Sequence, residues 1–338
     1  MSKITVVIAT ANRPKYLQTA LESVVSQTND LDLDSVLVSE NGGNRESEEI
    51  ANRFRGVLPI RYLFRSPSLD PVAHVLDLFG MNFEGVVAFL CDDDWWFDGH
   101  LYRSCCELDR WPGAASVFSA CAFLASEQAS HAIIYRPEPL VAAAGSKDFL
   151  KPWVLSFETV CAAAWLETPF HFSTMVARAP ALRLAAARIF GAHPNFTDRL
   201  LEAHLSAQGE VIFFPQPSAG IRIHDQNWSV GKSWKTMRDS DREGTVLIEA
   251  LASSRGFSCW EYWKGILPGL AKTSKSKLAK RFLWIHGSSV VKQNGLEMVL
   301  FSNKLEKLFR LLALYYGGAV VQLLPPIFAR LIRRLGSD

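Results

Sequence analysis

Short apolar runs alternate with amphipathic segments through the N-terminal third of the chain, and this alternation permits few folds. The run KITVVIAT at 3–10 is continuous and rich in β-branched residues, which is typical of a strand buried on both faces of a parallel sheet. Comparable runs follow at 34–43, 60–65 and 85–91. Segments of helical periodicity separate these runs, at 11–27, 46–56 and about 72–82, and Asn12 is the expected N-cap of the first. The pattern predicts an α/β fold with a doubly wound, mostly parallel sheet flanked by helices.

The rest of the chain is less regular. We expect a strand or strand pair at 114–125, and a strand, a Pro-rich turn, a second strand and a polar loop across 211–229. Between them, 195–209 predicts a helix that ends at Gly209. Beyond about residue 240 the pattern is helical with many lysines.

The composition indicates a globular protein, because 49% of the 338 residues are hydrophobic and 21% are charged. Its six cysteines form no C-x-x-C pair and no zinc spacing, so we expect reduced thiols of a cytoplasmic protein. No secretory signal is evident before the first strand.

The segment FLCDDDWWFDG at 89–99 places Asp92, Asp93 and Asp94 directly after an apolar run. Glu40 follows another run, and the carboxyl ends of parallel strands share one ligand-binding crevice. Adjacent carboxylates there can bind Mg²⁺ or Mn²⁺ or act as general acid and base. They can also cap a helix in a solvated turn. The residues alone leave all three uses open.

Three segments together resemble family-2 glycosyltransferases of the GT-A fold. They are VVIATANRPKYLQTALESVVSQT, VLVSENGG and VVAFLCDDDWWFDGHL, in the order and at the spacing of that family. The resemblance spans about residues 3–101 and, more weakly, extends to about 229. It implies a GT-A (Rossmann-like) fold with a C-terminal helical appendage, a nucleotide-diphosphate sugar donor and an Mn²⁺ or Mg²⁺ ion. Bacterial surface-polysaccharide (O-antigen-type) transferases are the subgroup suggested by size and by the basic tail.

The resemblance also implies site residues. Asp93 and Asp94 would bind the metal, completed by His224, and Arg222 would meet the diphosphate. Cys91 stands where many family members carry another Asp. Trp95 is the candidate for stacking on a sugar, whereas Trp96 is expected in the core. The donor nucleotide would lie against Thr10, Asn12, Arg13, Glu40 and Asp92.

The family's catalytic base is an Asp that opens a helix, and FTDRLLEAHLSAQG at 196–209 matches that segment. The resemblance therefore makes Asp198 the predicted base. The alternative is a first-turn Asp favoured by the helix dipole. Glu202, one turn later, is the second candidate and would also lie on the acceptor side.

The tail at 308–335 is apolar from Leu311 to Ala329 except for Gln322. Nineteen residues just span a bilayer, but two Gly and two Pro within them favour broken or interfacial helices. From Lys264 onward the chain has 13 basic and three acidic residues, a net charge of +10, and the rest of the chain carries −8. We therefore expect attachment to an anionic membrane surface. A packed helical subdomain or a dimer interface is the alternative.

These features predict three regions: a nucleotide-sugar-binding half at 1–105, an acceptor-binding half at 106–235 and a membrane-associating helical region at 236–338. The predicted activity is inverting, metal-dependent transfer of a sugar to a hydroxyl of a polyprenyl-diphosphate-linked glycan. It would occur at the inner face of the cell membrane, with no nucleic acid as partner. The rivals are a metal-dependent nucleotidyltransferase, although ATANRPK lacks the glycines of a triphosphate loop, and a non-catalytic glycan-binding or scaffolding relative.

Overall fold

The computed structural model describes residues 2–28, 31–43, 45–124, 132–145, 148–189, 197–224, 234–266 and 277–278. By its internal contacts the chain divides into two compact units, residues 1–274 and 275–338. All of the second unit except Lys277 and Leu278 lies outside the described residues, including the tail predicted to meet the membrane. The region boundaries predicted at 105 and 235 stay predictions.

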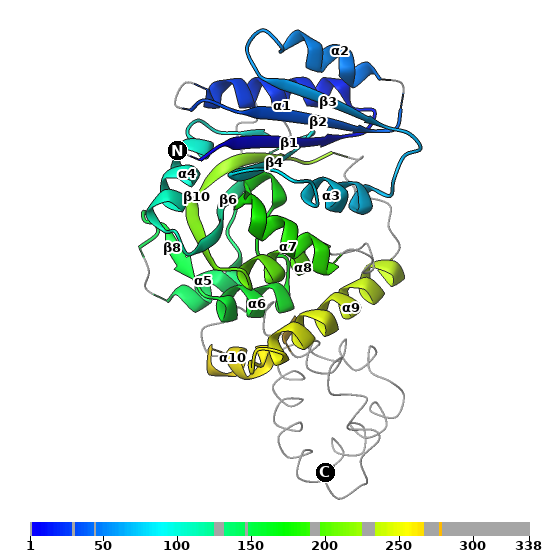
Figure 1. The fold of residues 1–338 in the computed structure, drawn as a ribbon. Coiled ribbons are helices and arrows are strands. Elements are labelled where there is room, and N and C mark those ends of the chain that lie inside the picture. The colour runs from blue at the N-terminus through cyan, green and yellow to red at the C-terminus, as the bar shows by residue number, and fades with distance from the viewer. Residues whose placement is uncertain are drawn as a thin grey trace, which may run out of the picture. The chain divides into compact units, whose positions relative to one another are not determined.

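The N-terminal part alternates strands and helices as the apolar pattern predicts (Figure 1). Strand β2 is buried along its whole length and β1 at all but one residue, which explains their continuous apolar runs. The elements are β1 (Ile4–Thr10), α1 (Pro14–Gln27), β2 (Ser35–Asn41), α2 (Glu46–Arg53), β3 (Ile60–Arg65), α3 (Pro71–Phe79) and β4 (Val86–Cys91).

The remaining elements mix short strands with helices and include one long strand, β10. They are β5 (Trp95–Trp96), α4 (His100–Arg110), β6 (Ala114–Leu124), β7 (Ile133–Tyr135), α5 (Glu138–Ala144), β8 (Trp153–Leu155), α6 (Phe157–Leu166), the 3-10 helix η1 (Phe172–Thr174), β9 (Val176–Arg178), α7 (Ala179–Ile189), α8 (Thr197–Ser206), β10 (Glu210–Arg222), α9 (Trp234–Ser253) and α10 (Cys259–Ile266).

The described strands form one mixed sheet with the order β3-β2-β1-β4-β9-β6-β10-β5, to which β7 and β8 pair at β6 and β10. The long ladders are parallel: β3-β2-β1-β4 and β6-β10. The short strand β9 is antiparallel to both β4 and β6 and joins the two parallel blocks. The sheet is therefore mostly parallel, as the sequence predicts.

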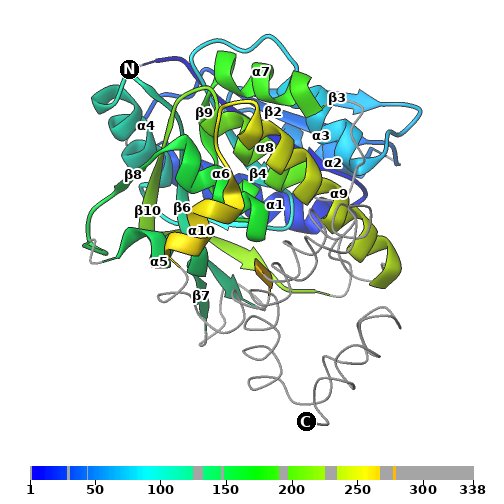
Figure 2. The same cartoon turned by 90° about the horizontal axis from the view of Figure 1, so that it is seen from below.

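Helices cover both faces of the sheet (Figures 1 and 2). Helices α1, α2 and α4 share a hydrophobic core with one face, through residues such as Leu17, Leu21 and Leu101. Helices α3, α7 and α8 pack together on the other side. Burying each such side chain contributes about 1.5–3 kcal/mol, so this periodic apolar spacing holds the layers together.

Two local expectations were wrong. Asn12 does not cap α1: the cap position is Arg13, without a side-chain bond, and Asn12 has φ +56° in the left-handed region that Asn tolerates. The segment at 211–222 is not two strands with a turn but part of the single strand β10. Shifts in its pairing with β6 occur around Pro217, because proline has no N–H to donate to the ladder.

Candidate active site

The three consecutive carboxylates lie in a buried corner at the carboxyl end of β4. Asp92, Asp93 and Asp94 are exposed by only 4%, 9% and 2%. In the sheet, Thr10 pairs with Glu40 and Ala9 pairs with Cys91, so β1, β2 and β4 end side by side. The structure thus brings the segments after these three strands to one edge of the sheet, as predicted.

A cation from the first loop meets this corner. The Arg13 guanidinium lies 2.9 Å from Asp93 Oδ2 and 3.4 Å from Asp92 Oδ1. The Thr10 hydroxyl donates to Asp92 Oδ2 at 2.7 Å. Burial, and then the charge of Asp93, nevertheless raise the pKa of Asp92 to about 7. The Arg13 guanidinium alone does not offset three buried carboxylates.

Asp94 connects the corner to the second half of the chain. The Ser173 hydroxyl donates to Asp94 Oδ2 at 2.5 Å, and the Arg222 backbone amide donates to Asp94 Oδ1 at 3.0 Å. Burial, and then the charge of Asp93, raise the pKa of Asp94 to about 8. His224, from the segment after β10, places Nε2 3.0 Å from Asp93 Oδ2. Residues predicted from two distant motifs therefore meet here.

The donor atoms of this corner fit a hard divalent cation. One ligand atom each of Cys91, Asp93 and Asp94 lies within 4.8 Å of the others. Carboxylate oxygens suit Mg²⁺ and Mn²⁺, whereas burial and the nearby carboxylates raise the pKa of the Cys91 thiol and keep it protonated. The raised pKa values of Asp92 and Asp94 indicate a deficit of positive charge that such an ion would relieve.

Arg222 and Trp95 form one wall of the corner. The Arg222 guanidinium lies 5.0 Å from the ring centres of both Tyr16 and Trp95, and its Nε donates to the Asp93 carbonyl oxygen at 3.1 Å. A Cβ on Gly220 would lie 2.3 Å from the Trp95 ring, so glycine is required for this close contact. Trp95 is itself buried, with Arg222 over its ring.

Trp96 lies in the main core, as expected. Its indole N–H donates to the Ser173 carbonyl oxygen at 2.6 Å.

Asp70, in the segment before α3, caps that helix by accepting from the amides of Val72 and Ala73. His74 is buried against the Ser39 hydroxyl. Neither residue belongs to the acidic corner.

The residues predicted to face the nucleotide lie beside the acidic corner. Glu40 is fully buried and accepts hydrogen bonds from the Ser47 and Tyr62 hydroxyls. A Cβ on Gly43, which has φ +101°, would lie 2.0 Å from Asn12 Oδ1 and 3.3 Å from Glu40 Oε1. Asn12 and Glu40 therefore both lie close to the position that a side chain on Gly43 would occupy, and Ser47 and Tyr62 fix the Glu40 carboxylate.

Asp198 lies in the first turn of α8. Its Oδ1 accepts from the Arg199 amide at 2.9 Å and its Oδ2 from the Thr168 hydroxyl at 3.4 Å. Burial raises the pKa of Asp198. Glu202, one turn later, is fully buried, and neither of its oxygens has a hydrogen-bond partner among the described residues. Burial, and then the charge of Asp198, raise the pKa of Glu202 well above its usual range.

Comparison with known proteins identifies the family. The model described as Glycosyl transferase family 2 matches residues 5–164, which include β1, β2, β4 and the acidic corner. The chain contains a family 2 glycosyltransferase domain. Among curated protein sequences, none matches the chain.

Solved structures show the same fold. One is TarS of S. aureus, residues 1–349, at 10% identity and a TM-score of 0.52, covering 85% of this chain and 87% of that one. The same TarS fragment in complex with UDP-GlcNAc has 12% identity and a TM-score of 0.50, covering 87% and 77%. A mannosyltransferase of Pyrobaculum calidifontis, solved with GDP-Man and Mn²⁺, has 15% identity and a TM-score of 0.49, covering 93% and 81%. Because their identities are this low, the two TarS structures show a shared fold alone.

The glycosyltransferase has a histidine at this site that its sequence did not reveal. His171 Nδ1 lies 3.8 Å from Asp94 Oδ2 and accepts a hydrogen bond from the Ser173 amide at 3.3 Å. The charges of Asp93 and Asp198 both act on the ring, although burial has the larger effect and lowers the pKa of His171. His171 thus lies near both the acidic corner and Asp198. No spacing or motif signals it, because η1 reaches the site only through the fold.

The buried position of Arg199 was also not predicted from the sequence. It is 1% exposed, and its guanidinium donates to the Ala164 and Trp165 carbonyl oxygens of α6 at 2.6 and 2.9 Å. It also pairs with Asp241 of α9 at 2.5 Å. Directly after Asp198, this side chain fixes the first turn of α8 between two helices. A lone Arg in an amphipathic helix gives no sequence signal of such burial.

Proposed function

We propose that this glycosyltransferase transfers a sugar, with inversion, from a nucleotide-diphosphate sugar to a hydroxyl of a glycan acceptor. The buried acidic corner at 92–94 is the observation on which the proposal rests, because it offers oxygen ligands beside the loop that carries Thr10, Asn12 and Arg13. TarS, which shares the fold, has been solved with UDP-GlcNAc, and this supports a nucleotide sugar as the donor class.

Asp93 and Asp94 would hold the Mn²⁺ or Mg²⁺ ion, with His224 beside Asp93. The bound ion would neutralise the departing diphosphate. Arg222 and Arg13 supply further positive charge to the same corner. Asn12 and the fixed carboxylate of Glu40 would contact the nucleoside, and Asp92 would lie against the ribose.

Asp198 would act as the base on the acceptor side. As the acceptor oxygen attacks the anomeric carbon, the bond from that carbon to the diphosphate breaks and the hydroxyl proton passes to Asp198. A pKa raised by burial brings a carboxylate nearer to the operating pH and makes it a stronger base. Attack opposite the leaving group inverts the anomeric carbon.

The family match favours this activity over a nucleotidyltransferase or a non-catalytic relative. The deciding experiment is calorimetric titration of UDP and GDP with and without Mn²⁺. We expect Mn²⁺-dependent binding in the wild type and at least a tenfold loss in Asp93→Asn, because the substitution removes a ligand charge. Asp98→Asn is the matched control, since Asp98 is an exposed carboxylate of the same segment. Unchanged Mn²⁺-dependent binding in Asp93→Asn contradicts the metal role.

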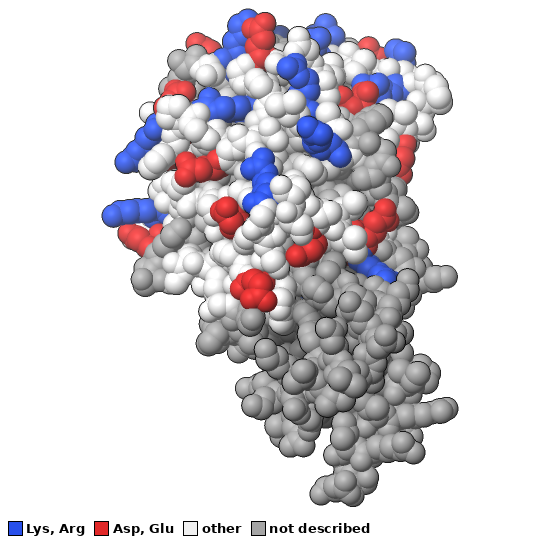
Figure 3. Space-filling model, turned by 60° about the horizontal axis from the view of Figure 1, so that its bottom comes forward, with Lys and Arg blue, Asp and Glu red and all other residues white. Residues whose placement is uncertain are grey.

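For the acceptor we propose a polyprenyl-diphosphate-linked glycan at the inner face of the cell membrane, met through the basic tail. In the described part of the chain, no helix has the length and apolarity to cross a bilayer. On the face that Figure 3 shows, basic and acidic side chains of the described residues are interspersed. The net charge of +10 from Lys264 onward is the feature that supports attraction to an anionic leaflet.

A further inference from the structure

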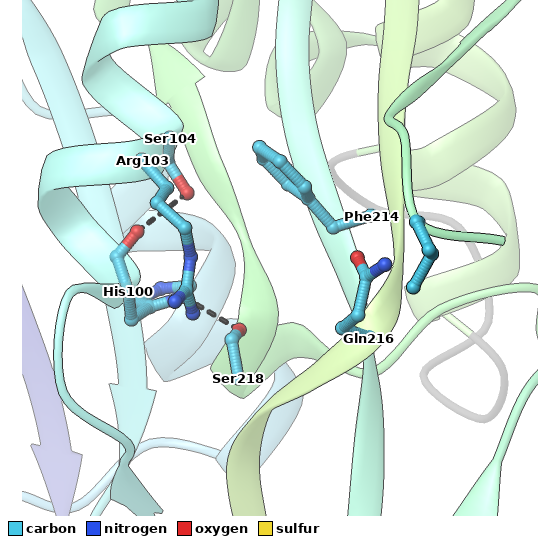
Figure 4. Close-up of a pocket in the computed structure, with 7 residues that line it drawn as sticks. His100, Arg103, Ser104, Phe214, Gln216 and Ser218 are labelled. Carbon is cyan, nitrogen blue, oxygen red and sulfur yellow. Dashed lines mark hydrogen bonds between the residues drawn. The ribbon is translucent and has the colours of Figure 1, made fainter.

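A cavity lies between α4 and β10, and the residues of the acidic corner are not part of its lining (Figure 4). Its volume is about 230 Å³. Six side chains form most of its lining: His100, Arg103 and Ser104 from α4, and Phe214, Gln216 and Ser218 from β10. Neither the predicted donor site nor the predicted base uses any of these residues.

A chain of hydrogen bonds behind the cavity fixes the protonation of His100. The Ser119 hydroxyl donates to the Ala120 carbonyl oxygen at 2.8 Å, so its proton is not available to Ser218. In the bond between the two serines, Ser218 is therefore the donor. Because the Ser218 hydroxyl donates its hydrogen bond to Ser119, its Oγ is the acceptor in the 2.7 Å hydrogen bond with His100 Nδ1. The network thus assigns the His100 proton to Nδ1.

His100 Nε2 consequently carries an unused lone pair. Burial lowers the pKa of His100 to about 3, so the ring is neutral and has one N–H, at Nδ1. Nε2 is buried and has no hydrogen-bond partner among the described residues. An unmet buried acceptor is unfavourable, and because Nε2 has almost no accessible surface, a donor from a bound molecule would reach it only after the lining side chains shift.

The rest of the lining complements a ligand rich in hydroxyl groups. Arg103 is exposed, lies beside His100 in Figure 4 and forms no ion pair within the described ranges, so its guanidinium can donate to ligand oxygens. Gln216 donates its amide N–H to the Phe149 carbonyl oxygen, which leaves its own oxygen as an acceptor. Because each sugar hydroxyl both donates and accepts, it matches this mixture, and the Phe214 ring offers an apolar wall for a pyranose face.

The size and position of the cavity limit which molecule can bind there. Small-molecule sites usually have volumes of roughly 300–1,000 Å³, so this smaller cavity suits one sugar ring and excludes a nucleotide sugar. Ser218 precedes Arg222 by four residues on β10, a separation on the order of 10 Å from the acidic corner.

We propose that the cavity between α4 and β10 binds one pyranose unit of the acceptor glycan, at a distance from the hydroxyl that receives the new sugar. The proposal rests on the proposed function in that the acceptor is a glycan. Such a site would hold longer acceptors more tightly without contributing to the chemical step.

Saturation-transfer NMR on the full-length protein tests this site with three probes: methyl α-D-glucopyranoside, methyl α-D-mannopyranoside and methyl β-D-galactopyranoside. We expect millimolar binding of at least one probe, weakened about fivefold or more in Arg103→Ala and in Gln216→Ala. Arg110→Ala is the control, because Arg110 is an exposed arginine two turns further along α4 that does not line the cavity.

Three results overturn the inference: no probe binds at concentrations on the order of 10 mM, binding is equal in Arg103→Ala and the wild type, or binding is lost in Asp93→Asn but kept in Arg103→Ala. The last result places the sugar in the catalytic crevice. The nucleotide titrations separate this inference from the proposed function. If UDP and GDP fail to bind while probe binding depends on Arg103, the proposed function fails and the sugar site stands.

Discussion

At the scale of single residues, Asp198 carries the sharpest consequence for activity. Asp198→Asn keeps the shape of the side chain but removes the group that accepts the proton. We expect donor binding to remain and turnover to fall by about 10²–10⁴-fold, the usual contribution of a positioned base. Turnover is measured with the donor identified by nucleotide-sugar screening, and binding by calorimetry. Near-normal turnover contradicts the assignment and moves the role to Glu202.

Glu202 gives a separate prediction for stability. Burial and the charge of Asp198 raise its pKa, so the folded state keeps a proton that the unfolded state releases. The stability that this proton confers is complete below the pKa of the unfolded chain and is lost as the pH rises through the folded pKa. Glu202→Gln cannot ionise, so its advantage over the wild type should be larger at pH 8 than at pH 5. Between the unfolded and the folded pKa of Glu202, the stability of Glu202→Gln relative to the wild type should increase by up to about 1.4 kcal/mol for each pH unit.

Urea unfolding at the two pH values measures this difference. Glu210→Gln is the control for loss of a carboxyl, because Glu210 is exposed at the start of β10. A Glu202→Gln effect that is equal at both pH values contradicts a buried, protonated carboxyl. Loss of turnover in Glu202→Gln with full turnover in Asp198→Asn assigns the base to Glu202.

The sequence predicted part of this site for a physical reason. Thr10, Glu40 and Asp92 each follow a strand of one parallel block, and such strands end at the same edge, so local pattern was enough to bring them together. His171 and Arg199 could not be predicted in this way. Their roles depend on contacts with residues 34 to 77 positions away, such as Trp165, Asp241 and Asp94, and no local periodicity encodes those contacts.

At the scale of elements, α8 depends on one buried ion pair. Arg199 joins it to α6 through two carbonyl oxygens and to α9 through Asp241 and the Thr245 hydroxyl. Asp241→Ala would remove the carboxylate that pairs with the buried guanidinium, and breaking a buried pair costs about 3–5 kcal/mol. We expect a decrease of that order in the free energy of unfolding, measured by urea denaturation.

The matched control is Lys3→Ala, which removes an ion pair with Glu84 of similar length, at 2.7 Å, but with both side chains exposed. Exposed pairs contribute about 0–1 kcal/mol. If the two substitutions have equal effects, the Arg199–Asp241 pair does not hold α8 in place.

The first parallel block was predictable at this scale because each strand and the helix after it carry their own periodicity. The second block was not. The three-residue strand β9 is too short to show alternation, and its antiparallel insertion between β4 and β6 is set by its neighbours. The proline residues in β10 suggested a turn, but the pairing shifts beside them keep the strand continuous.

At the scale of the whole molecule, charge is divided unevenly along the chain. Residues before Lys264 carry a net charge of −8 and those from Lys264 onward +10. An acidic catalytic part would be repelled by an anionic leaflet, so any electrostatic attraction must come from the C-terminal region. The distribution therefore predicts that catalysis and membrane attachment can be separated.

Deletion of residues 308–338 tests this separation. It removes Arg310, Arg330, Arg333 and Arg334 with the apolar run between them, and each basic residue contributes about 1 kcal/mol near an anionic surface. We expect the full-length protein to sediment with phosphatidylglycerol vesicles more than with phosphatidylcholine vesicles, and less at high salt. The deletion variant should lose most of this binding and keep Mn²⁺-dependent nucleotide binding, since the proposed donor site lies within the first unit. If the full-length protein sediments with neither kind of vesicle at low salt, or if the deletion variant sediments as much as the full-length protein, the tail is not the membrane contact. A packed subdomain or a dimer interface then becomes the better interpretation.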